Sequence, residues 1–190
     1  MKLLFLGGSF NPVHWGHLVL AEEIRDEFGY DKVLLVPAAC SPHKEYFDDP
    51  GSELRLEMLE LATAGNQDFV VDDCELRRSG YSYTIETISE LSSRYIFEGK
   101  LGLVIGDDLV VGYPRWRDPA ALALSADLIV ARRTGIDFQL PYPHRRASNR
   151  IIALSSSDIR ARVASGKSIR YLVPEPVRAY IAERSLYGTH

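Results

Sequence analysis

The stretch Gly7-Gly8-Ser9-Phe10-Asn11-Pro12-Val13-His14-Trp15-Gly16-His17 decides the fold. It follows the apolar run 3–6, which predicts a buried strand, and precedes residues 18–25, whose apolar positions recur at helical spacing. The pattern predicts a glycine-containing loop that joins a strand to the start of a helix. A glycine lets the backbone approach a ligand closely, and a helix start presents unpaired N–H groups and partial positive charge that suit a phosphate.

The two histidines of this stretch are candidates for phosphate chemistry. His14 and His17 are three residues apart, so within one helical turn their side chains share a face. Two imidazoles beside a phosphate site can place positive charge where a polyphosphate gains negative charge in a transition state. An HxxH pair alone is more often solvent-facing or part of a core. The stretch is neither a Walker A loop, which needs Gly-Lys-Ser/Thr, nor a GxGxxG dinucleotide motif.

The whole stretch resembles the GxFxPxHxGH signature of the nucleotidylyltransferase superfamily. Members of this superfamily transfer a nucleoside monophosphate from a triphosphate to a phosphate acceptor. The resemblance implies that His14 and His17 contact the phosphates, and that Gly8, Ser9 and Phe10 border the nucleotide with close backbone contacts.

Length and composition exclude several classes of protein. The chain has 190 residues, which suits one domain over residues 1–190 with a helical C-terminal part over residues 155–190. A net charge of −4 gives no basic excess, so we expect neither nucleic-acid nor membrane binding. Cys40 and Cys74 lack metal-site spacing, and the N-terminus lacks a signal-peptide pattern, which indicates a soluble cytoplasmic protein.

Apolar strands alternate with helices along the chain. This order predicts an α/β fold, a Rossmann-like doubly wound parallel sheet with a small C-terminal helical segment. We expect strands at 2–6, 31–37, 69–72, 100–105, 126–131 and 150–154. We expect helices at 16–29, 50–64, 82–97 and 119–125, one that opens at 155–160 and a final one that ends at 187; a helix cap over 107–112 is the alternative to a ligand contact there. Within the second helix, Leu54, Met58 and Leu61 form the expected core face. The charged segment 73–80 is expected to be exposed, and residues 135–149 to form a surface connection.

Ligands of such sheets bind beyond the carboxyl ends of the strands, so the loops there matter most. The loop after the second strand, residues 37–44, ends in His43-Lys44, and Lys44 is predicted to contact phosphate. The loop resembles the PxxxPHK loop of the bacterial nicotinate-nucleotide adenylyltransferases, which borders the nucleotide site. This resemblance narrows the superfamily to one family.

Two further strings match the acceptor site of that family. Ser82-Tyr83-Thr84 resembles its SYT motif, which implies that Thr84 helps to hold a pyridine nucleotide; from the residues alone, Thr84 is also a candidate helix cap. Trp116 stands where the family has a tryptophan that stacks on the nicotinate ring. Arg117 follows, where the family usually has an aromatic residue or a histidine, so the second ring contact is left open.

The remaining resemblances concern the nucleotide. Gly106 and Asp108 resemble the family's IGxD motif, which implies contacts to the adenosine ribose. Arg133 is placed near the adenylate, with Arg132 as the alternative. Ser155-Ser156-Ser157-Asp158-Ile159-Arg160 resembles the ISSTxIR motif, so Ser156, Ser157 and Arg160 are expected to hold the triphosphate, where an ordinary helix cap is the alternative.

Together these motifs imply a nicotinate-nucleotide adenylyltransferase of NAD synthesis. Its substrates would be ATP and nicotinate mononucleotide, its products nicotinate adenine dinucleotide and pyrophosphate, and Mg²⁺ would accompany ATP with few protein ligands. The catalytic residues would be His14, His17, Lys44 and Arg160. The alternatives are another adenylyltransferase of the superfamily and a non-catalytic nucleotide-binding module. A two-histidine metal hydrolase is disfavoured, because no third metal ligand stands at useful spacing. Self-association into a homo-oligomer is left open.

Overall fold

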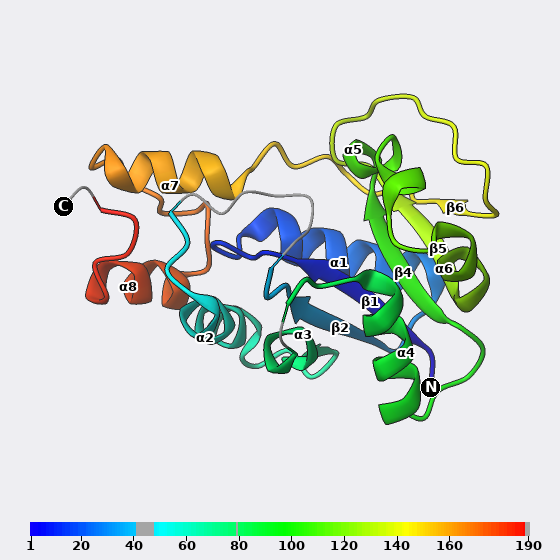
Figure 1. Ribbon diagram of the computed structural model, residues 1–190. Helices are drawn as coiled ribbons and strands as arrows, with labels where there is room; N and C mark the ends of the chain where they lie inside the picture. Colours follow the sequence, from blue (N-terminus) through cyan, green and yellow to red (C-terminus); the bar gives the residue numbers. More distant parts are fainter. Residues whose placement is uncertain (41–47, 79, 189–190) are drawn as a thin grey trace.

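The computed structural model describes residues 1–40, 48–78 and 80–188. Its centre is a sheet of six strands in the order β3-β2-β1-β4-β5-β6, with every neighbouring pair parallel (Figure 1). The strands are β1 (Leu3–Gly8), β2 (Lys32–Pro37), β3 (Phe69–Val71), β4 (Leu101–Gly106), β5 (Ala126–Ala131) and β6 (Arg145–Arg146). This is the Rossmann strand order, so the predicted fold class is confirmed.

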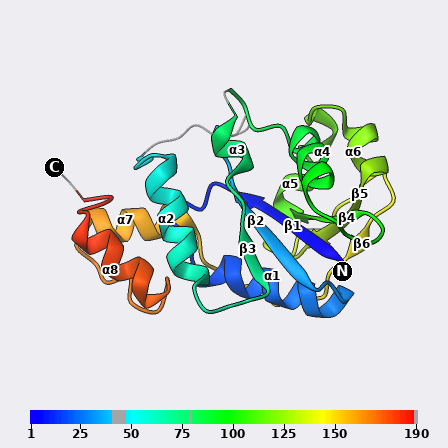
Figure 2. The same cartoon turned by 90° about the horizontal axis from the view of Figure 1, so that it is seen from below.

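Helices cover both faces of the sheet and extend past one end. The longer helices are α1 (Trp15–Phe28), α2 (Ser52–Thr63), α4 (Thr84–Arg94), α6 (Pro119–Ser125), α7 (Ser156–Ala164) and α8 (Glu175–Glu183). Two short helices, α3 (Cys74–Arg77) and α5 (Asp107–Val110), follow strands β3 and β4, and a 3₁₀ turn, η1, spans Tyr113–Arg115. In Figure 2, α1 lies on one face of the sheet, and α3, α4 and α6 lie on the other.

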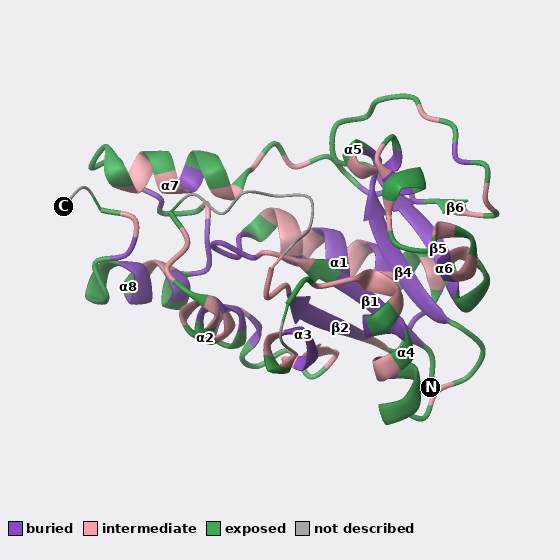
Figure 3. Cartoon of the chain, viewed as in Figure 1, coloured by how far each residue is buried: buried purple, intermediate pink, exposed green. Residues whose placement is uncertain are grey.

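Alternating residues of the strands pack into two separate hydrophobic cores, one on each face of the sheet. In β2, Val33 and Leu35 pack with α1, α2, α7 and α8, whereas Leu34 and Val36 pack with residues of α3, α4 and α6. This division follows from the two-residue period of a strand. Because both faces are covered, the central strands are buried along most of their length (Figure 3).

The strand order reverses between β1 and β4, which start crossovers in opposite directions. In open α/β sheets, the crevice at such a switch point is where ligands bind. The two strands end there in Gly8 and Gly106, and Gly7 and Gly8 belong to β1 itself. The expected glycine loop is therefore shorter than predicted, because the strand continues through both glycines.

The C-terminal helices return to the N-terminal loop. The backbone N–H of Trp15 donates to the carbonyl of Leu172 at 3.2 Å, and the Tyr187 hydroxyl donates to Asn11 Oδ1 at 2.6 Å. Helices α7 and α8 both lie beyond the carboxyl end of β1 in Figures 1 and 2, and α8 packs against α2. None of the described helices is both long and apolar enough to span a membrane.

Several predicted boundaries are wrong. Residues 150–154 form no strand, and the edge strand is instead the two-residue β6. Helix α2 starts at Ser52 behind Gly51, not at Pro50 behind Asp49, because the Asp49 carboxylate accepts the N–H of Gly51 and the Nε–H of Arg55. Helix α4 ends at Arg94 and α8 at Glu183, both earlier than expected.

Two local interpretations also fail. Thr84 is the first residue of α4 and makes no side-chain cap, because Tyr83 occupies the cap position. The segment after β3 is not fully exposed: it contains helix α3, and Glu75 within it is buried. The Glu75 carboxylate accepts the Thr87 hydroxyl of α4 at 2.6 Å, which draws the segment inward.

Candidate active site

The two histidines lie where β1 enters α1. His14 caps the helix in an extended conformation, and its N–H donates to Nδ1 of His17 at 3.3 Å. The two rings stack with centroids 3.7 Å apart, and the Phe10 ring meets His17 edge-on at 5.0 Å. A Cβ at Gly16 would lie 3.0 Å from the His14 ring, so glycine leaves room for this stack.

The His14 ring is buried in a position that disfavours its charged form. It is 2% exposed, and both of its ring nitrogens lack a hydrogen bond among the described residues. Burial, with a further contribution from the guanidinium of Arg133, lowers the pKa of His14 to about 4. At neutral pH the ring therefore carries one N–H donor and no charge. For His14, burial therefore corrects the prediction that both imidazoles bring positive charge.

Helix α7 places its first turn against the same loop. Ser155 caps the helix by accepting the N–H of Asp158 at 3.0 Å. The Ser156 hydroxyl donates to the Pro12 carbonyl at 2.9 Å, and Arg160 donates through Nη1 to the Asn11 carbonyl at 2.8 Å. The Arg160 Nε is buried with no acceptor in the described part of the chain. These bonds hold the helix start and the loop together.

A cleft opens between β1, β4, α1 and α7. Its volume of about 550 Å³ is in the range of small-molecule sites, about 300–1,000 Å³. We call it the phosphate cleft, and its described lining combines cations, hydroxyls and glycines: Gly7, Gly8, Ser9, Asn11, His14, His17, Gly106, Arg133, Ser155, Ser156, Ser157 and Arg160, with Leu6, Leu20, Val104 and Leu109. Carboxylates are missing from this described lining, which suits a highly charged anion.

Asp108 and Arg133 meet at the end of β4. Arg133 Nη1 lies 3.1 Å from Asp108 Oδ2, and a Cβ at Gly106 would lie 2.3 Å from Asp108 Oδ1 and 2.6 Å from Arg133 Cδ. Gly106 therefore makes room for this pair. Arg132 and Arg133 both line an adjoining cavity with Asp108, but of the two arginines Arg133 also lines the phosphate cleft. The geometry thus favours Arg133.

Asp107, which sequence reasoning passed over, fixes the loop that carries Arg133. Its carboxylate accepts the backbone N–H groups of Arg133, Thr134 and Gly135 and the Thr134 hydroxyl, at 2.7–3.0 Å for the shortest bond of each. Burial acts to raise the pKa of Asp107, and these hydrogen bonds outweigh it and lower the pKa. The signal was present in the sequence, since this acid directly follows a strand-end glycine.

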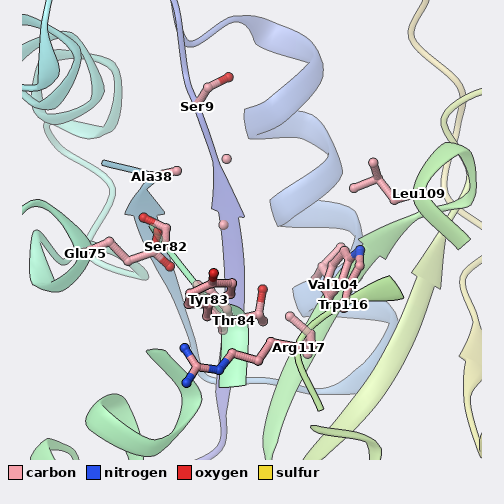
Figure 4. A pocket seen from close by; sticks show the side chains of 14 residues that line it. Ser9, Ala38, Glu75, Ser82, Tyr83, Thr84, Val104, Leu109, Trp116 and Arg117 are labelled. Carbon is pink, nitrogen blue, oxygen red and sulfur yellow. The ribbon is translucent and has the colours of Figure 1, made fainter. Parts of the chain in front are cut away.

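A second cavity adjoins the phosphate cleft across the end of β1. We call it the aromatic cavity, and Figure 4 shows its side chains. It shares Gly7, Gly8, Ser9, Val104 and Leu109 with the phosphate cleft, and its described lining adds Phe5, Ala38, Glu75, Ser82, Tyr83, Thr84, Leu103, Trp116 and Arg117. The predicted acceptor residues Thr84 and Trp116 therefore lie in one cavity, next to the predicted phosphate residues.

Arg55 connects the loops around both cavities and was missed from the sequence. It is 1% exposed and donates through Nη1 to the carbonyls of Ser9 and Ala38, both at 2.8 Å. Its Nε donates to Asp49 at 3.0 Å. The expected core face, Leu54, Met58 and Leu61, does pack on the core, with Met58 fully buried and the two leucines partly buried, and the structure adds Arg55 and Leu59 to the fully buried side chains. The helical spacing of Arg55 with the core residues was the available signal.

The structure brings nearly all predicted site residues to one edge of the sheet. Phe10 is not among the described residues that line either cavity: its side chain is buried, with its ring 3.2 Å from where a Gly8 Cβ would be, and its backbone has φ 46°. Lys44 and its neighbour His43 lie outside the described residues.

Comparison with known proteins shows the family of the chain. The cytidylyltransferase-like family profile matches residues 5–162. A protein of Borrelia garinii named as a probable nicotinate-nucleotide adenylyltransferase is 39% identical over 188 residues, covering 98% of this chain and 95% of its own length. One of Geobacillus thermodenitrificans with the same name is 40% identical over 187 residues, covering 98% and 86%. The chain belongs to the nicotinate-nucleotide adenylyltransferase family.

Solved structures extend the likeness of this adenylyltransferase to its fold. The nicotinic acid mononucleotide adenylyltransferase of Plasmodium falciparum, solved in complex with APC and with NaAD, superposes with TM-scores of 0.75 and 0.76 at 19% identity. Each comparison covers 98% of this chain and 96% or 97% of the other. The Rossmann-like sheet and its flanking helices are thus shared with a protein of low sequence identity.

Proposed function

We propose that the chain transfers the adenylyl group of ATP to nicotinate mononucleotide and releases pyrophosphate, as a step of NAD synthesis in the cytoplasm. One observation carries the proposal: the phosphate cleft and the aromatic cavity share the glycine-rich end of β1. A nucleoside triphosphate in the first would present its α-phosphorus next to an acceptor phosphate in the second. The family membership supports the choice of reaction.

The proposed mechanism requires no covalent enzyme intermediate. A phosphate oxygen of the acceptor attacks the α-phosphorus of ATP in line, and the bond from that phosphorus to the β-phosphate oxygen breaks. Catalysis then rests on positioning and on stabilising charge that develops on the phosphates. We assign positioning of the acceptor to Thr84 and Trp116, because both line the aromatic cavity.

We assign the phosphates to His14, His17 and Arg160. Two observations support this: the ring nitrogens of His14 and the Nε of Arg160 have no hydrogen-bond partner among the described residues. A buried polar atom without such a partner costs free energy that a phosphate oxygen would recover. The neutral His14 ring can donate one N–H to a phosphate oxygen and can take up a proton when the anion binds. Ser157, Ser156 and the backbone at Gly8, Ser9 and Phe10 complete the proposed cradle, and Lys44 remains a proposal from the sequence.

The adenosine part is assigned to the Gly106, Asp108 and Arg133 corner. The Asp108 carboxylate can accept from ribose hydroxyls, and its ion pair with Arg133 sets its position. Adenylyl transfer from ATP uses a divalent metal ion, and we propose Mg²⁺, held mainly by phosphate oxygens and water, which would neutralise phosphate charge. The cationic and hydroxyl-bearing lining of the phosphate cleft fits such a metal–nucleotide complex.

Pyrophosphate release from ATP and Mg²⁺, measured with a panel of phosphate acceptors, tests the proposal. We expect turnover with nicotinate mononucleotide, and a much slower reaction with nicotinamide mononucleotide and phosphopantetheine. Arg160→Ala should raise KM for ATP more than KM for the acceptor. Turnover with phosphopantetheine alone would identify a different transferase, and binding of ATP without turnover of any acceptor would indicate a non-catalytic module.

A further inference from the structure

Arg117 brings positive charge to the aromatic cavity. Among the described residues that line this cavity, Arg117 is the one cationic side chain and Glu75 the one carboxylate. The Glu75 carboxylate is already engaged by the Thr87 hydroxyl, so it offers little to a ligand. Any negative group on a ligand in this cavity, apart from the phosphate that faces the neighbouring cleft, would be drawn toward Arg117.

Contacts to helix α4 hold the Arg117 guanidinium in place. Its Cζ lies 4.5 Å from the centroid of the Tyr83 ring, a cation–π geometry, and Nη1 donates to Glu86 Oε1 at 2.8 Å. A guanidinium has five N–H donors in a planar fork, so these contacts leave donors for a carboxylate. Figure 4 shows the Arg117 side chain beside Tyr83 and Thr84 at the edge of the cavity.

The surroundings of Arg117 suit a flat ring that carries an anionic group. Trp116, the preceding residue, offers its indole to the same cavity, and Tyr113 packs against that indole with centroids 5.2 Å apart. Tyr83 and Thr84 place the N-terminus of the 11-residue helix α4 at the cavity, and such an end favours negative charge. The Trp116 ring, the N-terminus of α4 and the Arg117 guanidinium thus meet at the aromatic cavity.

We propose that the Arg117 guanidinium binds the ring carboxylate of the acceptor and is a determinant of the preference for nicotinate over nicotinamide mononucleotide. This inference rests on the proposed function and adds a side-chain charge to it. An amide in place of the carboxylate is neutral and presents an NH₂ half that a guanidinium cannot accept from. The ion pair with Glu86 partly neutralises the charge of Arg117. Removal of Glu86 should therefore raise the preference for nicotinate mononucleotide, whereas removal of Arg117 should lower it.

The test compares kcat/KM for both mononucleotides at saturating ATP and Mg²⁺. Arg117→Gln should lower the nicotinate-to-nicotinamide ratio about three- to tenfold, through KM for the nicotinate form, and Arg117→Lys should restore part of it. This range corresponds to about 0.7–1.4 kcal/mol. It lies at and above the upper end of what an exposed ion pair contributes, because Arg117 is half-exposed and a bound ring would displace water from it. Arg115→Gln is the matched control, since Arg115 is exposed, belongs to the same segment and does not line the cavity.

Glu86→Gln separates recognition from a structural role. If Arg117 only fastens its segment to α4, Glu86→Gln and Arg117→Gln break the same ion pair and should change the ratio alike. If Arg117 binds the carboxylate, the two variants should move the ratio in opposite directions. An unchanged ratio in Arg117→Gln overturns the inference and leaves adenylyl transfer standing. Failure of the wild-type chain to form dinucleotide from either acceptor would overturn the proposed function and, with it, this inference.

Discussion

Replacement of Arg55 should show that one buried cation holds the loops of the site together. Arg55→Met removes donors from the carbonyls of Ser9 and Ala38 and leaves Asp49 without its cation. Breaking a buried pair by removal of one partner costs about 3–5 kcal/mol. For a chain of this length, where about 1 kcal/mol corresponds to 2–4 °C, Tm should fall by about 6–20 °C.

Urea unfolding followed by circular dichroism measures this loss, and steady-state kinetics measures its effect on the site. Arg55→Lys keeps the charge without the fork, so it should lose less stability while kcat/KM still falls, because one ammonium cannot hold both carbonyls and the carboxylate. Glu60→Met, on the exposed face of the same helix, should stay within about 0.5 kcal/mol of the wild type. An Arg55→Met chain as stable as Glu60→Met would refute the reasoning.

Three further predictions concern the phosphate cleft. His17→Ala should lower kcat about 10²–10³-fold with an unchanged unfolding midpoint, and near wild-type turnover would remove His17 from charge stabilisation. Gly106→Ala should raise KM for ATP about tenfold, because its Cβ displaces the Asp108–Arg133 pair; equal increases for both substrates would argue against this. Between pH 6.5 and about 4, His14 is protonated in the unfolded chain but not in the folded chain. The free energy of unfolding should therefore fall by up to about 3 kcal/mol as the pH falls through this window. The difference between wild-type and His14→Gln urea titrations measures that contribution, and parallel pH dependence in the two chains would contradict it.

The sequence predicted the elements whose signals are local. Strand β5 and helix α6 begin and end where expected, because an apolar run and a proline at the helix start mark them within a few residues. Residues 150–154 have similar apolar character but no neighbouring strand pairs with them. Pairing is a long-range property that the run itself does not encode.

Within the site, the sequence predicted the side chains that belong to a motif but not the side chains that hold the surrounding loops in place. The histidines, Trp116 and Arg160 stand in recognisable strings, and the structure brings them to one edge of the sheet. Arg55 and Asp107 act on backbone groups far away in the sequence, so their roles become visible when the loops are placed. The His14 pKa likewise follows from burial by the tertiary fold rather than from its neighbours in the chain.

The bond between Ser156 and Pro12 has a consequence for biosynthesis. The two residues are 144 positions apart, and at about 5–20 residues per second a ribosome needs roughly 7–30 s to travel between them. During that interval the N-terminal loop lacks helix α7, which later fixes it through Ser156 and through the hydrogen bond from Arg160 to the Asn11 carbonyl. On the proposed assignment of Arg160 and the α7 serines to the triphosphate, the nascent chain lacks this part of its phosphate site until translation is nearly finished, and a stalled fragment that ends before α7 should bind ATP more weakly than the full chain.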